Sequence, residues 1–558
     1  MTAKISGSFS GASMHVLFVI PRFVAPGQFY QYSIGLASVY AFIRRYGVSV
    51  SCLNLNHESD NTYELLDREC AKRKVDMVCT GGMSMYWGEI EDVLVNTKRI
   101  NRDLVTVVGG PIITADPELA MTHLPIDYGV IGEGEYTLIE LLETLQRRGM
   151  PDTVKGLTFR NPDGQLVITE KREEIKNLDA LPIPEYEAFG FREGMGYFKY
   201  AQQLLTLETF SEVRFAEIIG SRSCPFSCTF CYHPLGKTYR QRSLDHIFSE
   251  IDYLHKNFGV NVIAFNDELL SINESRLLDL AERIRPYNIK WTACFRVNDV
   301  RLDLMKKLAE AGLMFANFGI ESINDDVLKS MKKHISKAKI VNALEVCREA
   351  RLECSGNIIL GDPAETTETA NESITWWKEN PVYHVSMGFI RAVPDAPIYR
   401  FALEKGLVKN KLSHVRNLPL INMSKMADKQ YYNLVLKVWW WNLMNTYAIP
   451  GTFISTHRLD ECYGNKHFYK LHVRCPFCGS EQIHKKFLAS SAPNVIISCS
   501  QCFAYFKIPQ KQAFPSDYSS KATVKNIVIK LAEAYSMRFF FIRNYRHVLK
   551  KLLKKLIY

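Results

Sequence analysis

The sequence contains no run of about 18 consecutive apolar residues, the length that a membrane-spanning helix requires. An apolar run near the start, at residues 15–21, is too short for the apolar region of a signal peptide and predicts a first strand instead. Nothing in the chain directs the protein out of the cytoplasm, and we expect to find it there.

Net charge is nearly absent from most of the chain. The total is +10, but residues 521–558 hold ten Lys/Arg and one acidic residue, a local net charge of +9. The other 520 residues therefore carry +1, so the body of the protein is not a polycation. No recognisable nucleic-acid-binding module accompanies the basic segment, and we expect no nucleic-acid partner.

The cysteines favour metal binding in a reducing compartment. Seven of the 14 cysteines fall in two close-spaced groups suited to metal, and the other seven are scattered. With 558 residues, of which 47% are hydrophobic and 23% charged, the chain is long enough for three or four globular domains.

The first cysteine group is a C-x3-C-x2-C triplet formed by Cys224, Cys228 and Cys231. Iron–sulfur clusters normally take four cysteines, so three thiolates would leave one iron of a 4Fe-4S cluster open to a substrate or cofactor. The alternative is a structural zinc knuckle completed by a nearby histidine such as His233.

The first 150 residues predict a doubly wound parallel sheet. Apolar strand-like runs that begin at residues 16, 48, 77, 105 and 128 alternate with helical stretches, as in βαβ units. Ligands bind such sheets beyond the carboxyl ends of the strands, and glycine lets the backbone approach a bulky ligand. Glycine-rich turns fall at that edge: Thr80-Gly81, Gly109-Gly110 and Glu133-Gly134.

Residues from about 213 to 400 again alternate strand and helix, which predicts a partial (β/α) barrel. Barrel chemistry gathers at the C-terminal ends of strands. Polar residues and glycines follow successive predicted strands there: Asn266, Asp267 and Glu268; Arg296 and Asn298; Glu321 and Ser322; Gly361, Asp362, Pro363 and Glu365.

Together these features resemble the cobalamin-dependent radical S-adenosylmethionine (SAM) family. The cysteine triplet, with Phe230 before its last cysteine, is similar to the radical SAM motif, and the Gly-Gly-Pro and Gly-Glu-Gly-Glu turns are similar to those of its cobalamin-binding domain. The resemblance spans about residues 14–400. It implies an α/β fold with a Rossmann-like cobalamin domain followed by a partial (β/α)6 TIM-type barrel.

The resemblance also implies a set of cofactor-binding residues. The three cysteines would hold a 4Fe-4S cluster whose open iron chelates SAM. The SAM-binding residues would be Phe230, Asp267, Glu268, Arg296, Glu321, Ser322 and Gly361, and the cobalamin-binding residues Thr80, Gly81, Gly109, Gly110, Glu133 and Gly134. The Asp-x-His-x-x-Gly cobalt-ligand signature is absent, which leaves His57 as the nearest candidate for a lower ligand.

The arrangement is that of the class B radical SAM methyltransferases, and the expected activity follows from it. One SAM would methylate cobalt, and a second would give the radical that activates an unactivated carbon of a small-molecule or lipid-like metabolite. An external electron donor of the flavodoxin or ferredoxin type is expected. A cyclase or rearrangement enzyme without methyl transfer is one alternative, and a non-enzymatic cobalamin- or metal-sensing protein is another.

The second cysteine group lies near the C-terminus. Cys475, Cys478, Cys499 and Cys502 form two C-x2-C pairs separated by 20 residues, the spacing of a zinc ribbon. A second iron–sulfur cluster is the competing interpretation, since four cysteines can hold either.

The chain ends in a basic amphipathic pattern. As a helix, residues 549–557 would carry leucine and isoleucine on one face and lysine on the opposite face. This pattern fits a helix that lies on an anionic membrane surface, or one that docks on the enzyme with its lysines in solvent. The predicted layout is 1–150 cobalamin domain, 151–205 linker with a hairpin at residues 161–164, 206–410 radical SAM barrel, 411–468 helical region, 469–510 zinc-ribbon-like module and 515–558 tail helix.

Overall fold

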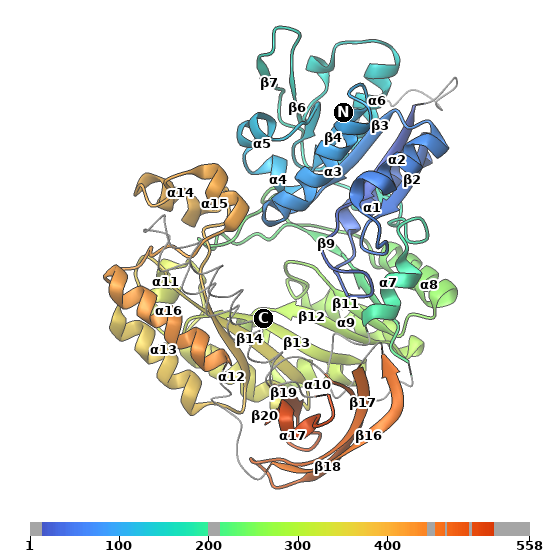
Figure 1. The fold of residues 1–558 in the computed structure, drawn as a ribbon. Coiled ribbons are helices and arrows are strands. Elements are labelled where there is room, and N and C mark those ends of the chain that lie inside the picture. The colour runs from blue at the N-terminus through green and yellow to red at the C-terminus, as the bar shows by residue number, and fades with distance from the viewer. Residues whose placement is uncertain (1–13, 199–211, 444–451, 464–465, 490–493, 518–558) are drawn as a thin grey trace.

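The computed structural model describes residues 14–198, 212–443, 452–463, 466–489 and 494–517 (Figure 1). The predicted tail helix, 515–558, lies almost wholly outside these ranges. Among the described residues no helix combines the length and the apolar character that crossing a membrane would take.

The N-terminal domain is built on a seven-stranded sheet of order β2-β1-β3-β4-β5-β6-β7, whose first five strands are parallel. Residues 16–20 of the first strand are fully buried, since helices cover both faces of the sheet. This arrangement confirms the predicted doubly wound sheet. The elements are β1 (His15–Ile20), α1 (Ile34–Arg45), β2 (Ser49–Asn54), α2 (Thr62–Arg73), β3 (Met77–Gly81), α3 (Trp87–Ile100), β4 (Val105–Gly109), α4 (Pro111–Thr114), α5 (Pro117–His123), β5 (Tyr128–Val130), α6 (Gly134–Gln146), β6 (Leu157–Arg160) and β7 (Leu166–Ile168).

The hairpin predicted in the linker belongs to this sheet. Strand β6 pairs antiparallel with β5, and β7 pairs antiparallel with β6 across the turn at residues 161–164. The N-terminal sheet thus continues past residue 150, and the hairpin covers the edge of β5 that would otherwise expose unpaired backbone groups.

The second domain is an open barrel of six parallel strands in the order β15-β14-β13-β12-β11-β8. Helices lie outside it, and the predicted partial barrel is confirmed. The short antiparallel pair β9 (Ser221–Arg222) and β10 (Arg240–Gln241) flanks the cysteine triplet. The other elements are α7 (Phe191–Phe198), β8 (Phe215–Ile218), α8 (Leu244–Phe258), β11 (Val262–Phe265), α9 (Glu274–Ile284), β12 (Lys290–Phe295), α10 (Leu302–Glu310), β13 (Leu313–Glu321), α11 (Asp325–Ser330), α12 (Lys337–Glu349), β14 (Glu353–Leu360), α13 (Thr367–Glu379) and β15 (His384–Phe389).

The segment predicted as helical, 411–468, is only partly so. After α14 (Pro397–Glu404), helices α15 (Lys411–Asn417) and α16 (Asp428–Leu443) follow as expected. Residues 453–463, however, form a strand, because they pair antiparallel with the next segment of chain. The C-terminal module therefore begins earlier than predicted, with β16 (Phe453–Tyr463), β17 (Lys466–Arg474), β18 (Glu481–Leu488), β19 (Asn494–Ser498), β20 (Tyr505–Pro509) and α17 (Gln510–Ala513).

This C-terminal module packs under the barrel (Figure 1). Tyr505 of β20 packs among apolar side chains from β8, β11 and β13, and its hydroxyl lies 3.2 Å from the buried carboxylate of Glu353, the first residue of β14. Ser498 of β19 also donates to Glu353. The module thus covers the N-terminal ends of the barrel strands and leaves their C-terminal ends to the site.

Candidate functional site

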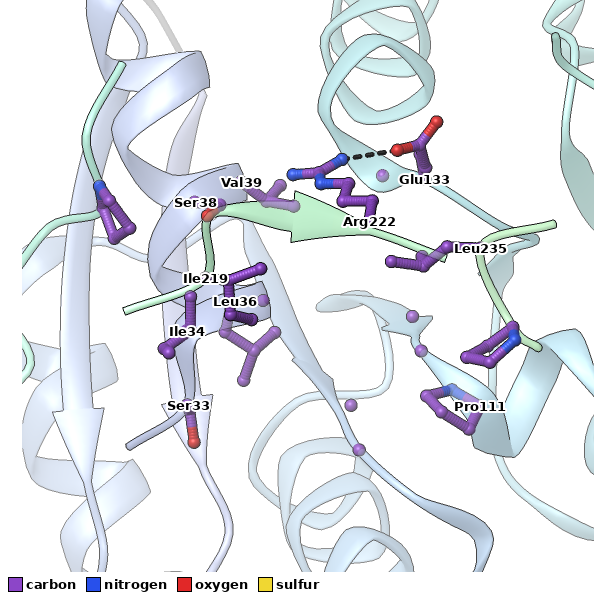
Figure 2. A pocket seen from close by; sticks show the side chains of 18 of the residues that line it. Ser33, Ile34, Leu36, Ser38, Val39, Pro111, Glu133, Ile219, Arg222 and Leu235 are labelled. Atoms are coloured by element: carbon purple, nitrogen blue, oxygen red, sulfur yellow. Dashed lines mark hydrogen bonds and ion pairs between the residues drawn. The ribbon is translucent and has the colours of Figure 1, made fainter. Parts of the chain in front are cut away.

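A cavity of about 760 Å³ lies between the two domains. On one side it is lined by the glycine-rich turns that follow β3, β4 and β5. On the other side it is lined by residues 219, 221–223 and 234–235, which flank the cysteine loop, and by Glu268. Figure 2 shows Arg222 and Leu235 of the second domain facing Val39 and Pro111 of the first.

The glycines of the first domain allow the chain to approach itself and the cavity closely. A Cβ on Gly81 would lie 2.3 Å from the carbonyl oxygen of Gly109, and Gly110 has a φ of +85°. A Cβ on Gly109 would meet nothing within 4 Å, so this glycine leaves room in the cavity. Thr80 does not line the cavity, because its buried hydroxyl donates to the carbonyl oxygen of Val19 at 2.9 Å.

Glu133 lines the cavity, but its carboxylate is already bound. One oxygen pairs with Arg222 at 2.6 Å, and the other pairs with Arg240 at 2.7 Å and accepts from a backbone N–H at 2.6 Å. Glu135 pairs with Arg222 at 2.5 Å. Both arginines come from the strands that flank the cysteine loop, so this cluster joins the two domains.

The cysteine loop is anchored by backbone contacts on both sides. The Thr229 N–H donates to the carbonyl oxygen of Met331 at 3.1 Å, and its own carbonyl accepts from Ile398 at 2.8 Å. Ser223, just before the triplet, has a φ of +69°, a strained conformation of the kind often found at functional sites.

The three thiols of the triplet differ in how readily they ionise: burial raises the pKa of Cys224, and the hydrogen bond to Cys228 together with burial raises the pKa of Cys231. The hydrogen bond from Cys231 lowers the pKa of Cys228 to about 6, and the nearby Lys333 ammonium also lowers it. Burial alone would lower the pKa of Lys333, but Glu321, 2.9 Å away, and the two cysteines keep it raised. Cys228 is therefore the thiol of the triplet that ionises most readily, and all three residues offer the soft sulfur ligands that iron–sulfur clusters take.

Three of the predicted SAM residues surround this loop. Arg296 lies 3.4 Å over the ring of Phe226 in the loop, and Lys333 lies 5.7 Å from the ring of Phe230. Glu321, at the end of β13, has a φ of +64°. The structure thus brings Phe230, Arg296 and Glu321 together at the cysteine loop.

The adjacent acids Asp267 and Glu268 differ in their surroundings. Asp267 is buried and accepts from the Gly220 N–H at 3.0 Å and from the hydroxyl of Ser221. Glu268 is partly exposed, lines the cavity and lies 3.1 Å from Nδ1 of His233. Asp267 therefore holds the start of β9, the strand that precedes the cysteine loop, whereas Glu268 faces the cavity.

The residues that follow β14, the fifth strand of the barrel, include a buried acid, Glu365. The Gly361 N–H donates to Glu365, and a Cβ on Gly361, whose φ is +105°, would lie 3.3 Å from the ring of Tyr431. Burial raises the pKa of Glu365 to about 8. Ser322 is also buried, and its hydroxyl accepts from the Asn324 N–H at 3.2 Å.

The structure does not bring His57 to the cavity. Its Nε2 lies 2.8 Å from the Tyr30 hydroxyl, its ring packs against Gly190, and it is not among the lining residues. Burial lowers the pKa of His57.

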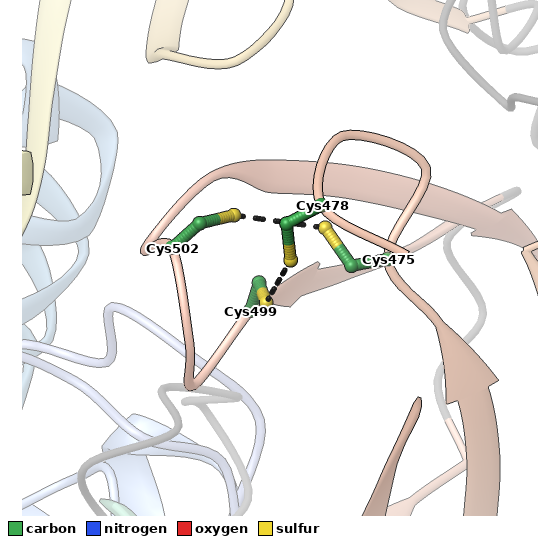
Figure 3. A group of neighbouring side chains, drawn as sticks. All are labelled: Cys475, Cys478, Cys499 and Cys502. Atoms are coloured by element: carbon green, nitrogen blue, oxygen red, sulfur yellow. Dashed lines mark hydrogen bonds between the residues drawn. The ribbon is translucent and has the colours of Figure 1, made fainter. Parts of the chain in front are cut away.

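The four C-terminal cysteines converge on one point (Figure 3). Their sulfurs all lie within 4.8 Å of one another, with Cys475–Cys502 at 3.7 Å and Cys478–Cys499 at 3.6 Å. In each knuckle a backbone N–H, from Phe477 or Gln501, lies 3.4 Å from the first sulfur. This geometry fits a single tetrahedral ion such as zinc.

The sequence analysis missed the residues that join the two domains. Glu135 occurs in the Gly-Glu-Gly-Glu turn, and Arg222 and Arg240 lie on either side of the cysteine loop, but nothing local distinguishes them from solvated charges. Their partners are 87–107 residues away along the chain, so only the fold reveals the pairs.

Comparisons with known proteins agree with this geometry. A radical SAM superfamily model matches residues 218–376, and a B12 binding domain model matches residues 23–142. The protein is therefore a radical SAM enzyme that carries a B12-binding domain.

The chain belongs to the cobalamin-dependent radical SAM family, and its relatives include methyltransferases. It is 29% identical over 351 residues to an uncharacterized methyltransferase of Pyrococcus horikoshii, covering 61% of this chain and 73% of the relative. It is 30% identical to the bacteriochlorophyllide d C-8(2)-methyltransferase of Chlorobaculum tepidum, covering 55% and 64%. It is 27% identical to the anaerobic magnesium-protoporphyrin IX monomethyl ester cyclase of Cereibacter sphaeroides, covering 56% and 50%.

Solved structures share the fold. The radical SAM methyltransferase TsrM of Kitasatospora setae, solved with cobalamin and a [4Fe-4S] cluster, superposes with a TM-score of 0.58 at 19% identity, covering 71% of this chain and 76% of that one. The cobalamin-dependent radical enzyme OxsB, solved with aqua-cobalamin and SAM, gives a TM-score of 0.56 at 15% identity, covering 98% and 73%.

Proposed function

We propose that the protein methylates an unactivated carbon of a small-molecule or lipid-like metabolite, using a 4Fe-4S cluster, SAM and cobalamin. The observation that carries the proposal is the cavity itself. Its glycine-turn wall is part of the B12-binding domain, and its opposite wall is formed by the chain that flanks the cysteine triplet.

The residues present fit these cofactors. Cys224, Cys228 and Cys231 would hold the cluster, and the lowered pKa of Cys228 suits a metal-bound thiolate. The glycine turns leave room for a broad ligand, as the empty space around a Cβ on Gly109 indicates. When bound, the three cofactors supply an electron, a carbon radical and a transferable methyl group.

The protein's own part is to bind, orient and shield. Glu268 can accept a hydrogen bond from the SAM amino group or a ribose hydroxyl. Arg296 and Lys333 would provide positive charge for the SAM carboxylate. Phe230, Glu321, Ser322 and Gly361 would complete the pocket at the strand ends. Asp267 would hold β9, and Glu133 would join the two domains, rather than touch a ligand.

A cyclase or rearrangement reaction is the second candidate. The relative named as a magnesium-protoporphyrin IX monomethyl ester cyclase favours it, although the chain spans only half of that relative's length. The same motifs serve both outcomes, because the fold does not set the fate of the substrate radical.

The remaining partners follow from the same reaction. Reduction of the cluster calls for an external electron donor of the flavodoxin or ferredoxin type.

We assign the group of four C-terminal cysteines to structural zinc, since four thiolates leave no open position on the ion.

The test is anaerobic reconstitution of the full chain with iron, sulfide and hydroxocobalamin, followed by SAM and a reductant. We expect 5′-deoxyadenosine and S-adenosylhomocysteine by mass spectrometry, with 5′-deoxyadenosine lost in Cys228→Ala. The matched control is Cys347→Ala, a buried cysteine of α12 outside the site, which should keep both products. S-adenosylhomocysteine missing from a protein that still makes 5′-deoxyadenosine would favour the cyclase.

A further inference from the structure

Four charged side chains form a buried cluster at the wall of the cavity: Glu133, Glu135, Arg222 and Arg240. We call them the arginine–carboxylate joint. Arg222 binds Glu133 at 2.6 Å and Glu135 at 2.5 Å, and Arg240 binds the other oxygen of Glu133 at 2.7 Å. No side chain of the four is more than 15% exposed. Figure 2 shows the Arg222–Glu133 pair beside the cavity.

Arg240 also binds both ends of the cysteine loop. Its Nη2 donates to the Ser223 hydroxyl at 3.3 Å and to the Leu235 carbonyl oxygen at 2.9 Å. Ser223 directly precedes Cys224, and Leu235 lies four residues after Cys231. One guanidinium thus joins the start of the loop, its end and the Glu133 carboxylate.

Glu135 lies in the first turn of α6, and Glu133 lies in the turn that leads from β5 into α6. This turn lines the cavity through Gly132, Glu133 and Gly134, and a helix N-terminus favours negative charge. Glu174 also lies 3.7 Å from Arg240. Breaking a buried pair leaves an uncompensated charge, so removing one member of the joint destabilises the contact between the domains. A planar guanidinium can hold several acceptors at fixed angles, which the single ammonium of lysine cannot.

We infer that the arginine–carboxylate joint positions the cysteine loop, and hence its cluster, relative to the cobalamin cavity. The inference rests on the proposed function, because it requires both cofactors. The four residues are positioning residues: they act by fixing the distance and angle between two sites. A misplacement of about 1 Å between reacting groups can cost about 100-fold in rate, which makes such rigidity valuable.

The chain supplies a matched control at a second contact between the domains. Arg416 of α15 binds Glu91 of α3 through both carboxylate oxygens, at 2.6 and 2.9 Å. This pair is partly exposed, and neither residue lines the cavity. Glu91→Gln therefore removes one charge from an ion pair between these elements at constant shape, without touching the cysteine loop.

The experiment is pulsed electron paramagnetic resonance on the reconstituted full chain, with the cluster reduced and cobalamin in its Co(II) state. The spin–spin coupling reports the distance between the two centres. We expect one narrow distance distribution in the wild type and in Glu91→Gln. In Arg240→Lys and Arg222→Lys we expect the mean or the width to change by about 1 Å or more.

Iron, sulfide and cobalamin contents are measured on every sample, so that only fully loaded proteins are compared. If the lysine variants do not assemble, Glu135→Gln removes one charge from the joint at constant shape and takes their place. A wild-type distribution in a fully loaded joint variant overturns the inference. A wild-type protein that binds no cobalamin or forms no cluster would instead refute the proposed function.

Discussion

At the scale of single residues, adjacent positions in one motif have different surroundings. Asp267 is buried against Gly220 and Ser221, while Glu268 faces the cavity. The adjacent glycines Gly109 and Gly110 also differ in their surroundings. Gly110 needs a φ of +85° with a ψ of −171°, a conformation that is essentially restricted to glycine, whereas Gly109 borders open space.

These two glycines give a paired prediction. Gly110→Ala should lower the free energy of unfolding by about 1–3 kcal/mol, because the backbone conformation is strained for alanine. Gly109→Ala should leave stability unchanged and weaken cobalamin binding by about tenfold, since its methyl group enters the cavity. Urea denaturation and cobalamin titration measure the two effects. Equal cobalamin affinity in Gly109→Ala and the wild type would show that the ligand does not approach this turn.

Glu365 predicts a pH dependence of stability. Its carboxyl keeps its proton to about pH 8 in the folded chain, because burial raises its pKa from 4.5. The folded protein therefore binds more protons than the unfolded one between these values, and the free energy of unfolding falls as pH rises through them. Relative to Glu365→Gln, the wild type should lose at most about 5 kcal/mol from pH 4.5 to 8. Parallel denaturation curves of the two proteins across this range would contradict the prediction.

At the scale of elements, the C-terminal module packs against the N-terminal ends of the barrel strands. Its strands β19 and β20 bring Ser498 and Tyr505 to the buried Glu353. Its four cysteines lie on the loops that precede β18 and follow β19. Metal binding at these loops should therefore stabilise the barrel as well as the module.

Removal of the metal tests this connection. The wild type should contain one zinc per chain, and Cys478→Ser should lose it and unfold about 5–10 °C earlier. Cys462→Ser, an exposed cysteine of β16 outside the group, should change neither value. Elemental analysis and thermal denaturation provide the measurements. A protein without zinc, whose iron content falls in Cys478→Ser while the triplet cluster is retained, would contradict the assignment of the metal.

At the scale of the whole molecule, the charge is concentrated in one terminal segment. Residues 521–558 carry a net +9, while the rest of the chain carries +1. Each Lys/Arg near an anionic membrane surface contributes about 1 kcal/mol of attraction, which salt screens. The tail alone could therefore bring the enzyme to a membrane.

Truncation after residue 517 tests the two interpretations of the tail. If it contacts membrane, the full chain should sediment with phosphatidylglycerol vesicles and dissociate at high salt, and the truncated chain should not sediment. Phosphatidylcholine vesicles are the uncharged control. A truncated chain that unfolds earlier, with no vesicle binding by the full chain, would instead favour a helix docked on the enzyme.

The cysteine triplet, the alternation of strands and helices in both domains, and the four-cysteine group could all be predicted from the sequence. These features depend on local spacing and periodicity, which the chain carries in any conformation. Which polar groups face the cavity could not be predicted, because it depends on how distant parts of the chain pack together. Thr80 donates a hydrogen bond to Val19, His57 is hydrogen-bonded to Tyr30, and Glu133 forms ion pairs with two arginines of the other domain. These partners lie far away along the chain, so no local pattern reveals the contacts. The β16 strand and the extended N-terminal sheet likewise follow from pairing with distant segments, which no local pattern specifies.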